Sequence, residues 1–196
     1  MTTVKKIKDE TRKVYLEKRT SMDPELKRKR DKKICDVATS LASYRYADYV
    51  LLYAPLDGEI DIMPVAEDAL SKGKKIAFPR CNKEDHTMDF HIVSSLDELS
   101  VDSYGIREPS ADAPVFDLKN CYSSMICFVP ALIYDKKGYR LGYGKGFYDR
   151  YLSSVKGNII GVVYSDFIVP SVPRGKFDVS LSILLTEKGV VVTSEN

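Results

Sequence analysis

The sequence contains no tryptophan, only two histidines and only four cysteines in 196 residues. Two histidines leave few bases for nucleophilic catalysis, and no G-x-S-x-G elbow is present, so a serine or cysteine hydrolase is not favoured. The cysteines form no C-x-x-C pair, which predicts reduced and mostly buried thiols. No apolar run approaches the roughly 20 residues of a membrane-spanning helix, so we expect no membrane partner.

The sequence also lacks a strong excess of charge of either sign. Its 30 Lys and Arg against 28 Asp and Glu leave a net charge of +2, which by itself indicates no particular partner. One basic block, KRKRDKK at 27–33, is either the solvated face of a helix or a nucleic-acid patch. The helical face is favoured, because no aromatic side chains are interleaved to stack bases, and we expect no nucleic-acid partner. The polar N-terminus has no apolar signal region, which predicts a cytoplasmic protein.

An alternation of helical and strand-like segments is present in the first half. Asp23, Pro24 and Glu25 have the composition of a helix start, with Asp as N-cap and Pro at the first helical position. A strand, a helix closed by Gly73 and a second strand follow, which predicts a βαβ unit with parallel strands. In order, the expected elements are helices over 5–20 and about 24–43, a strand over 49–55, a helix over 61–73 and a strand over 74–80.

The second half is richer in strands. An S-x-x-E capping box at 95–98 predicts a short helix, 105–117 is expected to be a loop, and Glu187-Lys188-Gly189 predicts a hairpin turn. Strands are expected over 87–93, from 124 onward, over 158–165, over 182–186 and over 190–193. Neither an internal repeat nor a linker divides the chain. We therefore predict a single α/β domain over 1–196, with a mainly parallel central sheet flanked by helices and a C-terminal β-hairpin.

The segment RLGYGKGFYDRYL, 140–152, combines three alternating glycines with basic and acidic side chains. Glycine lets backbone N–H groups approach an anion, and a carboxylate beside a phosphate site suits Mg²⁺. Two standard phosphate motifs fail here: G-x-G-x-x-G is broken by Phe147, and the P-loop pattern by Tyr139 and Gly146. A flexible glycine hairpin with exposed charges remains the alternative.

The longer run VPALIYDKKGYRLGYGKGFYDRYL, 129–152, resembles the signature of the 5-formyltetrahydrofolate cyclo-ligase family, P-[GA]-x-x-x-D-x-x-G-x-R-L-G-x-G-x-G-x-Y-D. The resemblance extends over nearly the whole chain. Lys8-x-x-x-Arg12 matches a basic pair near the family's N-terminus, YAPLDGEID at 53–61 matches a strand-end segment with a substrate-binding Glu, and FDVSLSILLTEKG at 177–189 matches the closing acidic segment. One departure is Tyr143, where members often carry Arg.

The resemblance implies a fold like that of sugar-phosphate isomerases and CoA transferases. It implies an ATP- and Mg²⁺-dependent reaction that converts 5-formyltetrahydrofolate into 5,10-methenyltetrahydrofolate, ADP and phosphate. In that reaction the formyl oxygen is phosphorylated and nitrogen 10 closes the ring, so ATP and the folate are the expected small-molecule partners. Relatives are commonly monomeric, and a monomer is expected here.

Roles follow from the matched positions. The resemblance implies that Arg140 and Lys145 neutralise charge in catalysis, that Asp149 and Asp178 hold Mg²⁺, and that Glu59 accepts hydrogen bonds from the pterin. The implied ATP-binding residues are Lys8, Arg12, Arg140, Leu141, Gly142, Tyr143, Gly144, Lys145, Gly146, Phe147 and Tyr148. The implied folate-binding residues are Ala54, Glu59, Tyr143, Gly144, Lys145, Gly146 and Phe147.

Three other interpretations stay open from the sequence. Another enzyme on the same fold would act on a different substrate with ATP or a phosphate ester. A non-enzymatic module would store folate or bind RNA through 27–33, which leaves the glycine segment without a purpose. A zinc site of Cys81, His86 and His91 is disfavoured, because no fourth ligand lies nearby.

Overall fold

The computed structural model describes residues 3–82, 84–101, 105–118 and 124–194. Within them, seven strands form a central sheet in the order β12-β11-β9-β6-β1-β2-β3. Neighbours from β11 to β2 run parallel, and the edge strands β12 and β3 run antiparallel to theirs, so the predicted α/β class and mainly parallel sheet are confirmed. The strands are β1 Tyr49–Leu51, β2 Lys75–Cys81, β3 Met88–Val93, β6 Met125–Pro130, β9 Asn158–Val162, β11 Ile183–Thr186 and β12 Gly189–Val192.

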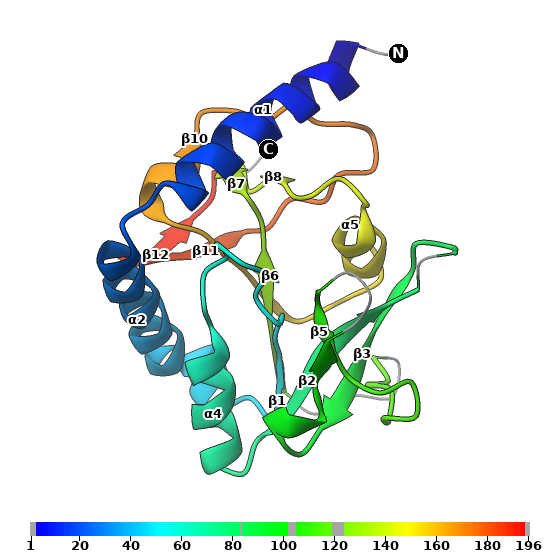
Figure 1. Cartoon of the computed structure of the whole chain (residues 1–196). Helices are drawn as coiled ribbons and strands as arrows, with labels where there is room; N and C mark the ends of the chain where they lie inside the picture. The colour runs from blue at the N-terminus through cyan, green and yellow to red at the C-terminus, as the bar shows by residue number, and fades with distance from the viewer. Residues whose placement is uncertain (1–2, 83, 102–104, 119–123, 195–196) are drawn as a thin grey trace.

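Helices cover the sheet on both sides. Figure 1 shows α2 beside α4 on the left of the view, α5 on the right near β3, and α1 crossing the upper end of the sheet. The inner strands are buried on both faces, as in β6, where every residue from Met125 to Val129 is buried. The helices are α1 Thr3–Thr20, α2 Pro24–Ser40, α3 Ala42–Arg45, α4 Met63–Ser71 and α5 Phe147–Leu152, with 3₁₀ turns η1 Leu96–Glu98 and η2 Ser165–Phe167.

Two smaller sheets complete the described structure. A three-stranded sheet in the order β10-β7-β8 lies under α1, and a two-stranded sheet joins β4 to β5. The segment expected to be a loop over 105–117 therefore contains a short strand. The bounds are β4 Ser100–Val101, β5 Arg107–Glu108, β7 Ile133–Asp135, β8 Arg140–Leu141 and β10 Ile168–Val169.

Several local predictions are confirmed. The Asp23 side chain caps α2 by accepting from the Leu26 amide at 2.8 Å. Ser95 and Glu98 form the capping box of η1, although that turn is 3₁₀. β1, α4 and β2 form the βαβ unit with parallel strands, and β11 and β12 form the C-terminal hairpin.

The second helix ends earlier than predicted. The chain breaks at Leu41, which has extended backbone dihedrals, and α3 then begins at Ala42. The change of direction buries Tyr44 completely, and its hydroxyl donates to Asp68 at 2.5 Å. Burial of this tyrosine in the tertiary structure therefore decides where α2 stops.

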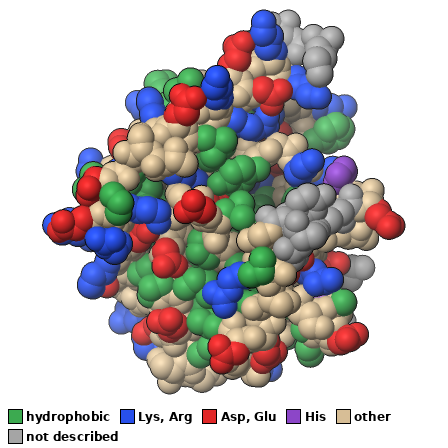
Figure 2. Space-filling view, in the orientation of Figure 1, with side chains coloured by type: hydrophobic (Ala, Val, Ile, Leu, Met, Phe, Trp, Pro, Cys, Tyr) green, Lys and Arg blue, Asp and Glu red, His purple; other side chains and the backbone are tan. Residues whose placement is uncertain are grey.

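The basic block at 27–33 lies on α2 and is largely paired with acids. Lys27 and Lys32 bridge to acids one turn further on, and Arg30 bridges to Asp166 and Glu187. Figure 2 shows basic and acidic side chains interspersed on the left of the view, where α2 lies. This pairing agrees with the favoured interpretation, the solvated face of a helix.

Two predictions about apolar groups can be compared with the structure. Cys35 and Cys127 are buried, as expected, while Cys81 is partly buried and Cys121 lies outside the described residues. None of the helices in the described part of the chain combines the length and the apolar character needed to cross a bilayer.

Candidate functional site

The glycine segment connects a strand to a helix. β8 ends at Leu141, and α5 begins at Phe147 with Gly146 as its N-cap. Gly144 and Gly146 have φ of +95° and +73°, backbone values that residues with a Cβ rarely adopt. The segment is thus a defined turn into a helix, in contrast to the flexible hairpin that the sequence left open.

Helix α1 brings Lys8 and Arg12 to this turn. Arg12 Nε donates to the Gly142 carbonyl at 2.9 Å. A Cβ on Gly144 would lie only 2.9 Å from Arg12 Cζ, so glycine is what lets the guanidinium lie against the backbone. Lys8 Nζ lies 2.7 Å from Asp178 Oδ2. Residues from both ends of the chain therefore meet at one site.

Arg140 and Asp149 form a second ion pair at this site. Arg140 Nη2 lies 2.6 Å from Asp149 Oδ1, and its Nη1 donates to the Val179 carbonyl at 3.0 Å. The same Asp149 oxygen accepts from the Val179 amide at 3.1 Å. Arg140 is only 7% exposed, so its guanidinium ties α5 to the segment after Asp178. Asp149 is therefore anchored by hydrogen bonds and lies in a helix.

The two carboxylates suit a hard cation. In Asp149, only Oδ1 accepts hydrogen bonds from the described part of the protein. In Asp178, only Oδ2 does, from the Lys8 ammonium and the Gly175 amide. Across the described residues, the other oxygen of each has no hydrogen-bond donor, and no group of three or more metal-ligating side chains occurs. Mg²⁺ commonly takes one or two carboxylates together with phosphate oxygens and water, which fits this donor set.

Glu59 lies in the connection after β1, and only 5% of it is exposed. Its Oε2 accepts from the Leu56 amide at 2.9 Å. Burial raises the pKa of Glu59 above its ordinary value, against the opposing effects of the Leu56 hydrogen bond, the Arg19 charge and the Tyr143 hydroxyl. Burial and the Glu59 charge raise the pKa of Tyr143 to about 12, so the phenol stays a donor. Ala54, on the same connection, is also buried.

Aromatic side chains lie around the start of α5. Phe147 is partly buried, and its ring meets that of His86 edge-on with centroids 6.0 Å apart. The Tyr148 hydroxyl is buried and has no hydrogen-bond partner among the described residues. The Lys145 side chain is exposed, while its carbonyl accepts from Arg150 Nη1 at 2.9 Å. A basic side chain and an aromatic ring are thus available to ligands at the turn.

Comparison with known proteins identifies the family. The model of the 5-formyltetrahydrofolate cyclo-ligase family matches residues 4–187, which is most of the chain. The chain belongs to this family. Among similar solved structures, that of 5,10-methenyltetrahydrofolate synthetase from Aquifex aeolicus shares 33% identity and a TM-score of 0.82, over 97% of this chain and 94% of that one.

Curated cyclo-ligases are more distant in sequence. The 5-formyltetrahydrofolate cyclo-ligase of Haemophilus influenzae is 29% identical over 76% of this chain and 80% of its own length. That of Mus musculus is 25% identical over 74% and 75%. This chain is thus an enzyme of the cyclo-ligase family. The likeness of its fold to sugar-phosphate isomerases and CoA transferases stays a prediction.

For this cyclo-ligase family member, the sequence analysis did not identify the buried arginine of α1. Arg19 is 3% exposed, and its Nη2 donates to the Ala131 carbonyl at 2.7 Å. The available signal was spacing: Arg19 follows Arg12 by two helical turns, so both lie on one face of α1. This spacing was not noticed because the sequence of α1 is polar along nearly its whole length.

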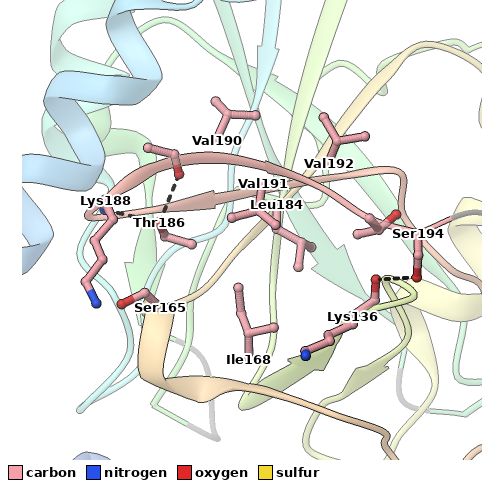
Figure 3. A pocket seen from close by; sticks show the side chains of 12 residues that line it. Lys136, Ser165, Ile168, Leu184, Thr186, Lys188, Val190, Val191, Val192 and Ser194 are labelled. Carbon is pink, nitrogen blue, oxygen red and sulfur yellow. Dashed lines mark hydrogen bonds between the residues drawn. The ribbon is translucent and has the colours of Figure 1, made fainter.

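A separate groove of about 550 Å³ lies between the C-terminal hairpin and β10. Figure 3 shows Leu184 and Ile168 on opposite sides of the groove, with Lys188 at the left of the view and Lys136 at the lower right. None of the site residues predicted from the sequence lines this groove.

Proposed function

We propose that this protein uses ATP and Mg²⁺ to convert 5-formyltetrahydrofolate into 5,10-methenyltetrahydrofolate, with release of ADP and phosphate. The observation that carries the proposal is the meeting of Lys8, Arg12 and two carboxylates near the glycine turn. The buried Glu59 lies close enough to Tyr143 of that turn for each to affect the pKa of the other. Basic side chains and glycine backbone suit the phosphates, and a buried carboxylate suits a ring edge rich in N–H donors.

The proposed chemistry overcomes a poor leaving group. The γ-phosphoryl group of ATP passes to the formyl oxygen: the bond from the γ-phosphorus to the β,γ-bridging oxygen breaks as the new P–O bond forms, and ADP leaves. Nitrogen 10 of the same folate then attacks the formyl carbon and loses its proton, and the C–O bond breaks to release phosphate. Neither step requires a covalent protein nucleophile, so catalysis consists of positioning and charge neutralisation.

Residues of the turn hold the nucleotide in this proposal. Lys8, Arg12 and Lys145 place positive charge around the phosphates, and the backbone of Gly142 to Gly146 approaches them closely. Asp149 and Asp178 would hold Mg²⁺ through the oxygens that the protein leaves without donors, and the ion would neutralise part of the phosphate charge. Arg140 neutralises charge in catalysis and orients Asp149, to which it is already paired.

The folate lies toward Glu59 in this proposal. Glu59 accepts hydrogen bonds from the amino-pterin edge, Ala54 lies beside it, and Phe147 or Tyr148 packs against the ring. Tyr143, where relatives often carry Arg, supplies a neutral hydroxyl to Glu59. We further expect a monomeric cytoplasmic enzyme with a single domain over 1–196 and with neither a nucleic-acid nor a membrane partner.

The test is a direct assay. The purified protein is mixed with 5-formyltetrahydrofolate, ATP and Mg²⁺, and the absorbance of the methenyl product is followed in the near ultraviolet. Parallel reactions omit ATP or Mg²⁺. A rise that needs both supports the proposal, whereas no rise from folded protein that still binds ATP would contradict it and indicate another substrate on the same fold.

A further inference from the structure

Arg19 is the buried charge of α1. Along the rest of the helix, every residue whose side chain is described is at least partly exposed, whereas Arg19 is 3% exposed. A buried guanidinium costs stability unless hydrogen bonds and nearby negative charge compensate it. An apolar residue would fill the same place with less cost, so the presence of arginine requires an explanation beyond packing.

The guanidinium joins two parts of the folate side of the site. Nη2 donates to the carbonyls of Ala131 and Leu132, at 2.7 and 3.3 Å, where β6 passes into β7. The aliphatic part of the Arg19 side chain lies against the turn before Glu59. A Cβ added to Gly58 in that turn would be 3.7 Å from Arg19 Cγ. Arg19 and Glu59 also line the same small gap in the structure. Arg19 therefore contacts both the backbone that precedes the glycine turn and the turn that presents Glu59.

Part of the guanidinium is left without a partner. Nε is buried and makes no hydrogen bond within the described residues, and no direct ion pair to Arg19 is found there. Its charge nevertheless acts on Glu59 and Tyr143, whose pKa values both respond to it. The charge of Arg19 thus acts on the Glu59 region and also on Tyr164, and its Cζ lies 5.8 Å from the centroid of the Phe167 ring.

We propose that Arg19 is a positioning residue for folate recognition, which holds the Glu59 carboxylate and the β6–β7 junction in place from α1. This inference rests on the proposed function, because it takes the pterin edge as the ligand of Glu59. It adds that α1 serves both substrates: its N-terminal part, through Lys8 and Arg12, faces the ATP turn, and its C-terminal part, through Arg19, supports the folate subsite.

The ionisation of Glu59 is the property that Arg19 supports. The groups near Glu59 come from five parts of the chain. They are the Leu56 amide and Tyr53 from the connection after β1, Arg19 from α1, Lys27 from α2, Tyr143 from the glycine turn and Tyr148 from α5. Burial raises the pKa of Glu59, and the Arg19 charge opposes that rise. Without the charge the carboxyl would take up a proton at higher pH, and a protonated carboxyl loses acceptor capacity for the pterin N–H groups.

The test compares Arg19→Met and Arg19→Lys with the wild-type protein. Affinity for 5-formyltetrahydrofolate is measured by calorimetry without ATP across a range of pH, and affinity for ATP is measured separately. Tyr44→Phe is the matched control, because it removes a buried hydrogen bond to Asp68 outside the site. It should lower the melting temperature while leaving both affinities unchanged.

For Arg19→Met we expect folate affinity at neutral pH to fall at least about tenfold and ATP affinity to change less than about threefold. The pH at which folate binding is lost should move upward. Arg19→Lys keeps the charge and should restore most of the pH profile, while losing part of the affinity because Lys cannot repeat the contacts of the guanidinium. In a Glu59→Gln background, Arg19→Met should change folate affinity little further.

Three results would overturn the inference. Folate affinity and pH profile equal to those of Tyr44→Phe would make Arg19 purely structural. Equal losses of affinity for ATP and for folate would show that Arg19 supports the whole site and not the folate subsite in particular. If Arg19→Met does not fold, the test uses Arg19→Lys, for which most of the wild-type pH profile of folate binding should be kept. The inference would be contradicted if the profile of Arg19→Lys differed from wild type as much as the profile of Glu59→Gln does. Failure of the wild-type protein to bind 5-formyltetrahydrofolate would instead reject the proposed function, and the Arg19 inference with it.

Discussion

Lys8 of α1 and Asp178 form an ion pair, with Nζ 2.7 Å from Oδ2, although 170 positions separate them in the chain. Both side chains are largely shielded, at 19% and 18% exposed. The contact closes the first helix onto the C-terminal part of the chain. It also places a cation that suits phosphate beside a carboxylate whose other oxygen has no hydrogen-bond donor among the described residues.

Lys8→Met should therefore affect ATP more than stability. We expect the KM for ATP to rise at least about tenfold, because one phosphate-neutralising charge is lost. The free energy of unfolding should fall by only about 1 kcal/mol, as for a partly exposed ion pair. Steady-state kinetics and urea unfolding measure the two effects. An unchanged KM for ATP with a large loss of stability would assign Lys8 a structural role only.

Gly144→Ala should damage the site through contact with Arg12. The φ of +95° is strained for alanine, which costs about 1–2 kcal/mol, and the new Cβ would displace the Arg12 guanidinium. Gly73→Ala is the matched control, since Gly73 has φ of +71° with open space around it, outside the site. Both variants should lose stability, and only Gly144→Ala should lose ATP affinity. Equal kinetics in the two variants would count against the close approach of Arg12.

Asp149→Asn should lose both turnover and stability. The sequence alone predicts little packing for this carboxylate, but the structure shows that it compensates the buried Arg140 charge and accepts from Val179. We expect a loss of about 1–3 kcal/mol in unfolding free energy, because a buried charged donor loses its partner. Turnover should fall by a larger factor, and Mn²⁺ affinity in the presence of ATP should fall with it. Full activity in a destabilised variant would remove Asp149 from the metal site.

Arg140→Lys should also fail as a conservative change. One ammonium cannot repeat the two divergent contacts of the guanidinium to Asp149 and Val179. We expect the KM for ATP to rise and turnover to fall, with unfolding free energy lowered by about 1–3 kcal/mol. Kinetics for ATP equal to wild type would contradict both the phosphate role and the orienting role of Arg140.

Glu59→Gln should separate folate binding from stability. Because the pKa of Glu59 is raised in the folded protein, the folded state holds the proton more tightly than the unfolded chain, and stability falls as pH rises through that window. Glutamine removes this loss, so the variant should gain stability relative to wild type as pH increases from acid to neutral. The KM for folate should rise. Melting curves across pH and folate kinetics test the two parts, and a relative stability that declines with pH would refute the raised pKa.

Local signals in the sequence predicted the elements well where the structure depends on neighbouring residues. The Asp23 cap, the capping box at 95–98 and the turn at 187–189 each involve a few residues close in sequence. The glycine turn was found because its spacing is a family signature. The end of α2 was misplaced because burial of Tyr44 in the tertiary structure determines it.

The site was harder to predict, because its contacts join distant parts of the chain. Residue types and the family signature selected Lys8, Arg140, Asp149 and Asp178, but not which acid each base pairs with. Arg19 looks like one more charge on a polar helix until α1 packs over the β6–β7 junction. Such roles depend on packing between elements, which periodicity does not reveal.

The central claim is that ATP phosphorylates the formyl oxygen of the folate. It is tested most directly by supplying 5-formyltetrahydrofolate labelled with ¹⁸O at the formyl group, together with ATP and Mg²⁺, and measuring the isotope in the released phosphate by mass spectrometry. The account predicts one labelled oxygen in each phosphate formed with the methenyl product. Unlabelled phosphate alongside the same product would contradict it.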